Sequence, residues 1–468
     1  MLADIQILSG QAFEGRQTGS TGDVRAAEWV AARFAALRLT VAPVLPSETA
    51  DSSSSTHEPA PSVPVYVIGD DPHLEVSTAQ GATIGRAPAD YLPILDSPPV
   101  HVTASVVFVG YGISDPARGY DDYAGLDVRN RIVLFMRGKP DHYPSPVSHA
   151  DKERVARENG AVAFLTVTGP ILNPYEVRRG MTTAPSAFYG RQGGIPPLPG
   201  AWISPAFADR LLSSAVRGDQ PLRILQESLN QSRRPHSQPT GSMVHMAWDS
   251  LHTSGPLYNV VASIPGRQPD LKEQTVILGA HRDHFGRQAG LLFPGADDNA
   301  SGTAVVLEVA RVLMESGLQA ARTVTFVSFS GEEQGLLGSQ LYVNRRPRDP
   351  VKPSGMINVD HAGIGNGRLT VGITGFDKRV AQDAGQAAGL AEHLDLFGFF
   401  PGGDHVPFKE AGVPTVTVVS GGPHLHYHKP TDTPETINPE ILQSAARYVL
   451  ALVWQLANPH ERISGTGH

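Results

Sequence analysis

The segment TVILGAHRDHFG at residues 275–286 decides the fold of this chain. Its mostly apolar first half ends directly at His281, a pattern typical of a buried strand that delivers a polar side chain to the edge of a sheet. The same pattern, an apolar run followed by an acidic or histidine-rich segment, returns further along the chain. The later runs are TVTFVSFS at 323–330, MINV at 356–359 and PTVTVV at 414–419.

Helical segments alternate with these predicted strands. Residues 301–316 are predicted to form one helix, and the last helix is expected over Pro439–Ala457, with Asn438 as its N-cap. This alternation predicts an α/β fold with a mostly parallel, doubly wound sheet and helices on both faces. Ligands bind beyond the carboxyl ends of the strands in such sheets, and most of the candidate site segments begin there.

The N-terminal half of the chain has a different pattern. Residues 21–39 are expected to form an amphipathic helix, and the Ser- and Pro-rich residues 43–64 an exposed connection. The following stretch, up to about residue 225, is β-rich with Gly/Pro loops, and residues 226–241 are expected to be a return linker. We therefore predict one domain made of residues 1–64 and 238–468, interrupted by an inserted segment at 65–237.

The composition excludes several classes of function. The 468 residues contain no cysteine, which excludes disulfides, thiolate metal sites and a cysteine nucleophile. With a net charge of −8 and no block of Lys and Arg, no nucleic-acid partner is expected. No apolar stretch reaches the roughly 18 residues that span a bilayer. Neither an HExxH zinc helix nor a GxSxG nucleophile elbow occurs.

Two histidines and three carboxylates near the predicted strand ends have the chemistry of a two-metal site. Zinc is a borderline metal that accepts both nitrogen and oxygen donors. Hydrolysis of an amide needs a nucleophilic water and a stabilised oxyanion, and two zinc ions roughly 3.5–4 Å apart can supply both. One carboxylate then bridges the ions, and each ion keeps one histidine and one carboxylate. We predict that Asp298 bridges, that His281 pairs with Asp360, and that Glu333 pairs with His428.

Two further residues are predicted to support this chemistry. Glu332 precedes the ligand Glu333 and is free to act as the general base, which takes a proton from the attacking water and delivers it to the leaving amine. Asp283 lies two residues beyond His281, and side chains at that spacing share one face of an extended segment. Asp283 is therefore predicted to accept the second ring N–H of His281.

The other histidines are weaker candidates. His405 in GGDHVPF, and His424 and His426 in HLHYH, are candidates for the lining of a substrate pocket, with a packing role equally open. His284 and His361 are expected to be structural.

In their order and settings, the predicted site residues resemble those of the co-catalytic dizinc aminopeptidases of metallopeptidase family 28. The resemblance covers residues 259–457 and the segment FEGRQTGSTGDVRAAEWVAARF at 13–34. It implies a zinc exopeptidase fold with two zinc ions per chain, acting on peptides with a free N-terminus. It also implies release of N-terminal residues by a metal-bridging hydroxide, with Glu332 as general base. One departure is His361, because an apolar residue, often Met, commonly follows the ligand aspartate.

The inserted segment resembles a protease-associated domain over about residues 99–214. In related enzymes this domain lies over the active-site cleft, which implies a role in limiting access. Chains with this insertion are usually exported, so a secreted or periplasmic location is expected. A cytoplasmic location stays open, because the sequence does not begin with a signal peptide. The matching features are VGYGI at 109–113, YDDYAGLDVRNRIVLFMRG at 120–138 and GAVAFLTV at 160–167.

Three alternative functions remain open at the level of sequence. A carboxypeptidase or deacylase of a related dizinc family carries its extra domain between the third carboxylate segment and the last histidine, whereas here Asp360 to His428 reads as continuous core. A glutaminyl cyclase uses one zinc ion, and the ligands for two are present. A non-catalytic receptor on the same fold would be expected to have lost ligands or the base. The sequence does not indicate the oligomeric state.

Overall fold

The chain forms two compact units in the structure, which is a computed structural model. The structure describes residues 1–41, 61–172, 177, 182–190, 197–232, 234–345 and 352–459. The predicted connection at 43–64 therefore lies largely outside the described residues. The first unit contains Met1–Val65, Ser254–Gly286 and Leu292–His468, and the second contains Tyr66–Thr253 and Arg287–Leu291. No helix in the described part of the chain is both long and apolar enough to cross a membrane.

An eight-stranded sheet forms the centre of the first unit. Its strands, in spatial order, are β1 (Thr40–Val41), β14 (Val260–Ile264), β18 (Thr323–Phe329), β15 (Gln274–His281), β19 (Lys352–Asp360), β22 (Thr415–Ser420), β20 (Leu369–Thr374) and β21 (Leu394–Phe397). The four central strands, β18, β15, β19 and β22, are parallel. Strands β14 and β20 run antiparallel to their inner neighbours. The predicted apolar runs are these central strands, which are buried as parallel strands usually are.

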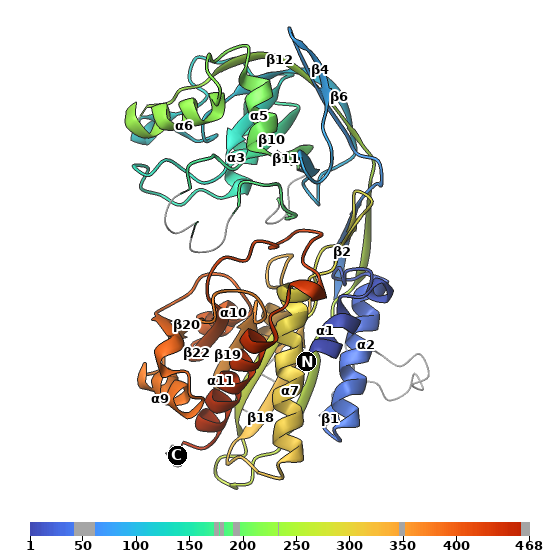
Figure 1. Cartoon of the computed structure of the whole chain (residues 1–468), viewed down its shortest axis with the longest axis vertical. Coiled ribbons are helices and arrows are strands. Elements are labelled where there is room, and N and C mark those ends of the chain that lie inside the picture. The colour runs from blue at the N-terminus through green and yellow to red at the C-terminus, as the bar shows by residue number, and fades with distance from the viewer. Residues whose placement is uncertain are drawn as a thin grey trace. The chain divides into compact units, whose positions relative to one another are not determined.

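Helices cover both faces of this sheet. Along β15, Val276 and Leu278 join one apolar cluster, whereas Ile277 between them joins another on the opposite face. The larger cluster contains residues of α7 and α11, which lie side by side in Figure 1. The helices of this cluster are α1 (Leu2–Leu8), α2 (Thr21–Ala36), α7 (Gly302–Glu315), α9 (Arg379–Ala387) and α11 (Pro439–Ala457), and those of the smaller one are α8 (Leu337–Arg345) and α10 (His405–Glu410).

The helix boundaries follow local capping chemistry. The Asn438 side chain accepts hydrogen bonds from the backbone N–H groups of Glu440 and Ile441, and Pro439 occupies the first turn of α11, as predicted. The Ser20 hydroxyl caps α2 in the same way by accepting from the N–H of Asp23. These caps satisfy backbone donors that have no partner within the helix, so each helix begins where its cap lies.

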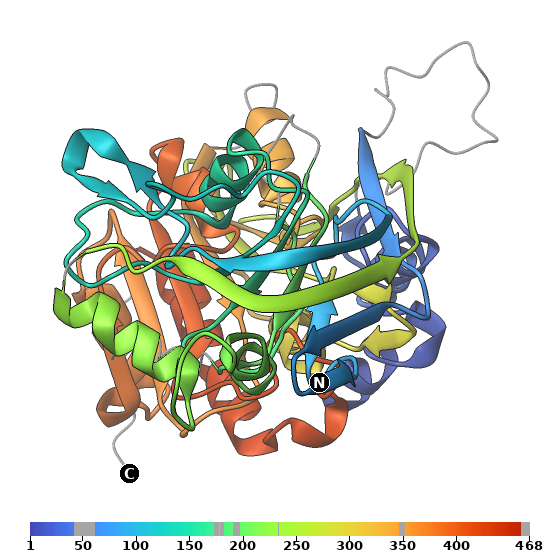
Figure 2. The same ribbon diagram turned by 90° about the horizontal axis from the view of Figure 1, so that it is seen from above.

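The second unit contains an eight-stranded mixed sheet. Its strands, in spatial order, are β4 (Gly81–Ile84), β3 (His73–Thr78), β12 (Gln238–Trp248), β6 (Val100–Phe108), β9 (Ile132–Met136), β10 (Ala163–Val167), β11 (Gly200–Ile203) and β5 (Tyr91–Pro93). Strands β6, β9, β10 and β11 are parallel, and the long β12 runs antiparallel beside β6 (Figure 2). The helices of this unit are α3 (His149–Glu158), α5 (Pro205–Leu212) and α6 (Pro221–Ser232).

Short strands complete the described structure. The chain passes between the units through β2 (Ser62–Ile68) and β13 (Ser250–Pro256), which pair with each other. Two further two-stranded sheets are formed by β7 (Ser114–Asp115) with β8 (Tyr120–Asp121), and by β16 (Gly286–Gln288) with β17 (Leu291–Phe293).

The prediction that residues 226–241 form a return linker is wrong. Its polar first half belongs to α6, which buries Leu222, Leu225 and Leu229 and leaves most of its polar side chains exposed or partly exposed. Its second half begins β12, which pairs with β3 and β6. The chain therefore returns to the first unit after Thr253, rather than at residue 238. The polar composition that suggested a linker is that of the solvent-facing side of an amphipathic helix.

Candidate metal centre

The candidate ligands meet at the carboxyl ends of the parallel strands of the first unit. His281 is the last residue of β15, and Asp360 is the last residue of the neighbouring β19. Asp298 lies in a helical turn (Ala296–Ser301) that precedes α7. Glu333 follows β18, and His428 lies in the loop after β22. Open α/β sheets bind ligands at this edge.

The first group of donors consists of His281, Asp298 and Asp360. The Nε2 atom of His281 lies 3.4 Å from Asp298 Oδ1 and 3.4 Å from Asp360 Oδ1. The three donor atoms lie within 4.8 Å of one another. This is the set predicted for one of the two ions.

The second group contains Asp298, Glu333 and His428. The Nε2 atom of His428 lies 3.0 Å from Asp298 Oδ2 and 3.4 Å from Glu333 Oε2. Asp298 thus directs one carboxylate oxygen toward each group. The structure brings together all five residues that the sequence analysis selected as metal ligands.

Buried polar atoms without hydrogen-bond partners are consistent with a metal ion bound at this position. Within the described residues, His281 Nε2 and Asp360 Oδ1 are buried and have no hydrogen-bond partner. Buried polar atoms without partners are costly, and a bound metal ion would satisfy both of these. The donor set of imidazole nitrogens and carboxylate oxygens is also one that zinc accepts.

Glu332 and Glu333 carry strongly perturbed carboxyl groups. Burial raises the pKa of Glu332 well above its usual range, the carboxylates of Asp360 and Asp404 raise it further, and His281 opposes the shift. Burial raises the pKa of Glu333 in the same way. Several buried carboxylates therefore lie close together at the centre, and the neighbouring histidines offset only part of their negative charge. A carboxyl group with a raised pKa is suited to taking up a proton near neutral pH.

Asp283 supports the site differently from the prediction. The Nδ1 atom of His281 lies 3.2 Å from the main-chain oxygen of Asp283, and its carboxylate is more distant, at 3.7 Å. The Asp283 carboxylate instead accepts hydrogen bonds from Thr18 Oγ1 at 2.8 Å and from the backbone N–H of Glu332 at 3.3 Å. Asp283 thus fixes the backbone of the predicted base to the N-terminal segment.

The sequence analysis missed the roles of two residues. His284, expected to be structural, places Nδ1 2.7 Å from Glu333 Oε1 and 4.0 Å from Asp298 Oδ2. The carboxylate of Asp432 accepts the backbone N–H groups of Asp297 and Asp298, at 2.9 and 3.0 Å. The available signals were the closeness of His284 to His281 in sequence and the aspartate of KPTDT after His428. Hydrogen-bonded neighbours of ligands commonly orient them in this way.

The three weaker histidine candidates have different environments. His424 is buried, and its Nδ1 lies 2.6 Å from Asp297 Oδ2. His426 Nδ1 lies 2.9 Å from the hydroxyl of Thr431, in an exposed position. His405 is buried at the start of α10, and its Nε2 lies 2.7 Å from the carbonyl oxygen of Phe400. The contact of His405 agrees with a packing role, and the assignment of the three histidines to a substrate pocket stays a prediction.

Arg16, in the N-terminal segment, holds the two loops that carry site residues. It is fully buried, and its guanidinium donates to the main-chain oxygens of Arg282, Pro294 and Gly295 at 2.6 to 2.8 Å. A planar guanidinium with several donors can satisfy several carbonyls at once. The segment 13–34 therefore belongs to the same structural unit as the candidate site.

The fold and this cluster define an α/β protein with a candidate two-metal centre. Residues 259–453 match the family model described as Peptidase family M28. Over this region the chain is a homologue of that family.

Relatives with curated descriptions match part of the chain. Aminopeptidase YwaD of Bacillus subtilis (strain 168) is 33% identical over 180 residues, which are 36% of this chain and 39% of that protein. A probable leucine aminopeptidase of Arthroderma otae is 31% identical over 216 residues, which are 42% of this chain and 57% of that protein. The matched part of the chain thus spans 39% and 57% of the length of these two relatives.

Solved structures match nearly the whole chain. An aminopeptidase from Aneurinibacillus sp. strain AM-1 has a TM-score of 0.68 at 24% identity, covering 100% of this chain and 95% of that one. BSAP, described as a zinc aminopeptidase from Bacillus subtilis, has a TM-score of 0.59 at 21% identity, covering 99% and 96%. At these identities the likeness shows the fold, which is mixed α/β with a mostly parallel central sheet.

Proposed function

We propose that this chain is an aminopeptidase that binds two zinc ions and releases N-terminal residues from peptides with a free N-terminus. The position of Asp298 carries the proposal: its Oδ1 lies 3.4 Å from His281 Nε2, and its Oδ2 lies 3.0 Å from His428 Nε2. A bridging carboxylate must face two groups of donors in this way. The descriptions of the matched relatives as aminopeptidases support the same activity.

The distances between the donor atoms assign the ligands to two ions. His281 and Asp360 would hold one ion, Glu333 and His428 the other, and Asp298 would be shared. When bound, zinc lowers the pKa of water to about 7 and polarises the carbonyl of the scissile bond. His284 keeps its contact with Glu333 and fixes that ligand's orientation.

Glu332 is the proposed base, because it lies beside the ligand Glu333 and is not needed as a ligand itself. It would take the proton from the attacking water and give it to the leaving amine. Asp283 accepts the backbone N–H of Glu332, so it limits the movement of this residue relative to His281.

Metal content measured together with substrate range tests the proposal. Elemental analysis would quantify zinc, and a panel of aminoacyl-arylamides would be assayed before and after chelation and zinc return. We expect bound zinc, loss of activity on chelation, and hydrolysis of free but not N-acetylated substrates. Activity only on N-acylated or C-terminal substrates would replace the aminopeptidase by another dizinc hydrolase. No zinc and no turnover would overturn the enzyme assignment.

The second unit is proposed to be a protease-associated domain that limits the length of the substrates. The support is sequence resemblance over about residues 99–214, a range that includes β6, β9, β10 and β11. Hydrolysis rates for a series of peptides with the same N-terminal residue and increasing length test this role. We expect the rates to fall with length, and equal rates over the whole series would contradict the proposal.

A further inference from the structure

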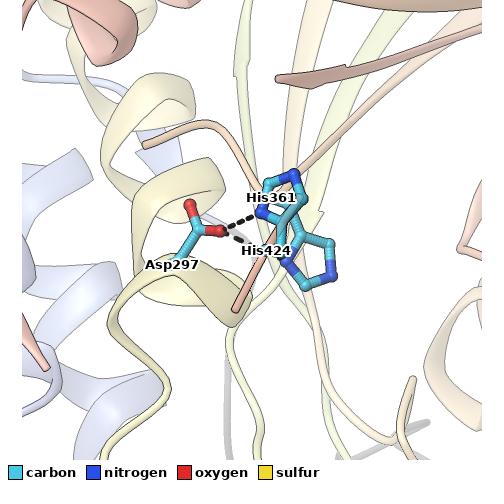
Figure 3. A group of neighbouring side chains, drawn as sticks. All are labelled: Asp297, His361 and His424. Atoms are coloured by element: carbon cyan, nitrogen blue, oxygen red, sulfur yellow. Dashed lines mark hydrogen bonds and ion pairs between the residues drawn. The ribbon is translucent and has the colours of Figure 1, made fainter. Parts of the chain in front are cut away.

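Asp297, His361 and His424 form a third group of donors in the first unit. Asp297 precedes the proposed bridge in sequence, His361 follows β19, and His424 lies in the loop after β22. Figure 3 shows both imidazoles directed at one carboxylate oxygen, Asp297 Oδ2. The Nδ1 atoms of His424 and His361 lie 2.6 and 3.4 Å from that oxygen. The three donor atoms lie within 4.8 Å of one another, and the proposed dizinc site uses none of the three residues.

The hydrogen bonds of His424 leave a lone pair facing this carboxylate. The Nε2 atom of His424 lies 3.0 Å from the main-chain oxygen of Ser420. A carbonyl can only accept, so Nε2 carries the proton of the neutral ring and Nδ1 presents its lone pair to Asp297 Oδ2. At 2.6 Å a proton between the two atoms completes a hydrogen bond, and a metal ion would take the place of that proton with the two atoms further apart.

His361 presents a second nitrogen to the same point. Its Nδ1 is buried and has no hydrogen-bond partner among the described residues. Its Nε2 lies 3.7 Å from Asp298 Oδ2 and 3.7 Å from Asp360 Oδ1. A ring whose second nitrogen faces a carboxylate or a carbonyl is the usual arrangement of a metal-bound histidine. The imidazole of His424 has this hydrogen bond, whereas the Nε2 atom of His361 faces its two carboxylates from beyond hydrogen-bond distance.

The backbone holds the donors in these orientations. His361 has a φ of 46°, in the left-handed region that residues other than glycine rarely adopt. Its carbonyl oxygen accepts the N–H of Ser420 at 2.9 Å, which ties this turn to the end of β22. Asp297 Oδ1 accepts the N–H of Gly363 at 2.8 Å, so Oδ2 stays directed at the imidazoles. Strained backbone that the surroundings hold in place is common at functional sites.

We propose that Asp297, His361 and His424 bind a third divalent cation of the zinc class, in addition to the pair around Asp298. Two imidazole nitrogens and one carboxylate oxygen are a donor set that zinc accepts, and water would complete a tetrahedral shell. His361 connects this ion to the pair, because the other side of its ring faces Asp298 and Asp360. The site goes beyond the proposed aminopeptidase activity and does not depend on it.

Zinc content compared between variants tests the third site. His361→Leu removes both ring nitrogens, and His361→Asn removes the imidazole but keeps a residue type that tolerates a positive φ. His393→Leu is the matched control, because His393 is exposed and outside the group. We expect each His361 variant to bind one zinc ion fewer per chain than the wild type and His393→Leu. The difference in zinc content between the wild type and the His361 variants tests the third site. The zinc content that remains in the His361 variants tests the dizinc site, so the two proposals can fail separately.

Equal zinc content in the wild type and the folded His361 variants would overturn the proposal and leave a proton between Asp297 and His424. If neither variant folds, anomalous scattering at the zinc edge from wild-type crystals gives the answer. A peak about 2.0–2.2 Å from each of the three donor atoms is the expected result. Peaks only around Asp298 in zinc-saturated crystals would contradict the third site.

Discussion

Asp23 Oδ1 lies 3.0 Å from Arg282 Nη2, and both side chains are fully buried. The ion pair joins α2 to the residue that follows the proposed ligand His281. Arg282 also donates to the main-chain oxygens of Ser328 and Tyr258, at 3.0 and 2.9 Å. Helix α2 therefore holds the end of β15, where the site begins.

Asp23→Asn is expected to lower the free energy of unfolding by about 3 kcal/mol, because it leaves the buried charge of Arg282 without its partner. Denaturation with urea at pH 7 measures the change. The control is Arg154→Ala, which breaks an exposed pair with Glu158 and should cost at most about 0.5 kcal/mol. An Asp23→Asn protein as stable as the control would contradict the importance given to this pair.

Glu332→Gln is expected to retain the bound zinc and to lower kcat by roughly 10²–10⁴-fold, because only the proton acceptor is removed. Elemental analysis and steady-state kinetics on an aminoacyl-arylamide measure the two effects. Glu315→Gln, at an exposed position near the end of α7, is the control and should leave both unchanged. A metal-free Glu332→Gln protein, or one with near-normal kcat, would show that the base has been assigned to the wrong residue.

Asp298→Asn is expected to weaken both proposed zinc ions together, because each oxygen of Asp298 faces a different group of donors. Titration of the metal-free protein with zinc, in competition with a chelator of known affinity, separates the two affinities. The matched variant is Glu333→Gln, which removes a ligand from one group and should weaken one ion much more than the other. Loss of a single ion in Asp298→Asn would argue against bridging.

The strand ends could be predicted from the sequence because composition changes abruptly there. The apolar runs ending at His281 and Asp360 are β15 and β19, and parallel strands place their carboxyl ends at one edge. The start of α11 was equally clear, because Asn438 and Pro439 define it locally. Each of these predictions used only residues that are neighbours in sequence.

The contacts between loops could not be predicted in this way. His284 contacts Glu333, 49 positions away, and His424 contacts Asp297, 127 positions away. These pairs form only when loops from different strands meet, and no spacing within one segment encodes them. The return linker was misplaced for a related reason, since only the pairing of β12 with β3 and β6 shows where it belongs.

Lys152, in the second unit, provides a prediction about pH. It is buried on α3, and its ammonium donates to the main-chain oxygens of Met136 and Gly138. Burial lowers the pKa of Lys152 from 10.5 to about 7, Arg137 lowers it further, and Asp122 opposes the shift. Between these two pH values the unfolded chain binds a proton that the folded chain has released. The contribution of Lys152 to stability therefore becomes more favourable as the pH rises through this window.

The Lys152→Met protein should therefore lose stability relative to the wild type as the pH rises from 7 to 10, by as much as about 4 kcal/mol. Asp122 also lowers the stability of this variant as the pH rises. Without the neighbouring ammonium, the ionised carboxylate of Asp122 is less stable in its buried position. Urea denaturation of both proteins at pH 7, 8.5 and 10 measures the difference, and Lys272→Met, at an exposed position in the first unit, is the control. A difference in stability between wild type and Lys152→Met that stays constant over this range would show that Lys152 remains charged in the folded protein, with its ammonium stabilised by Asp122 and the two carbonyls.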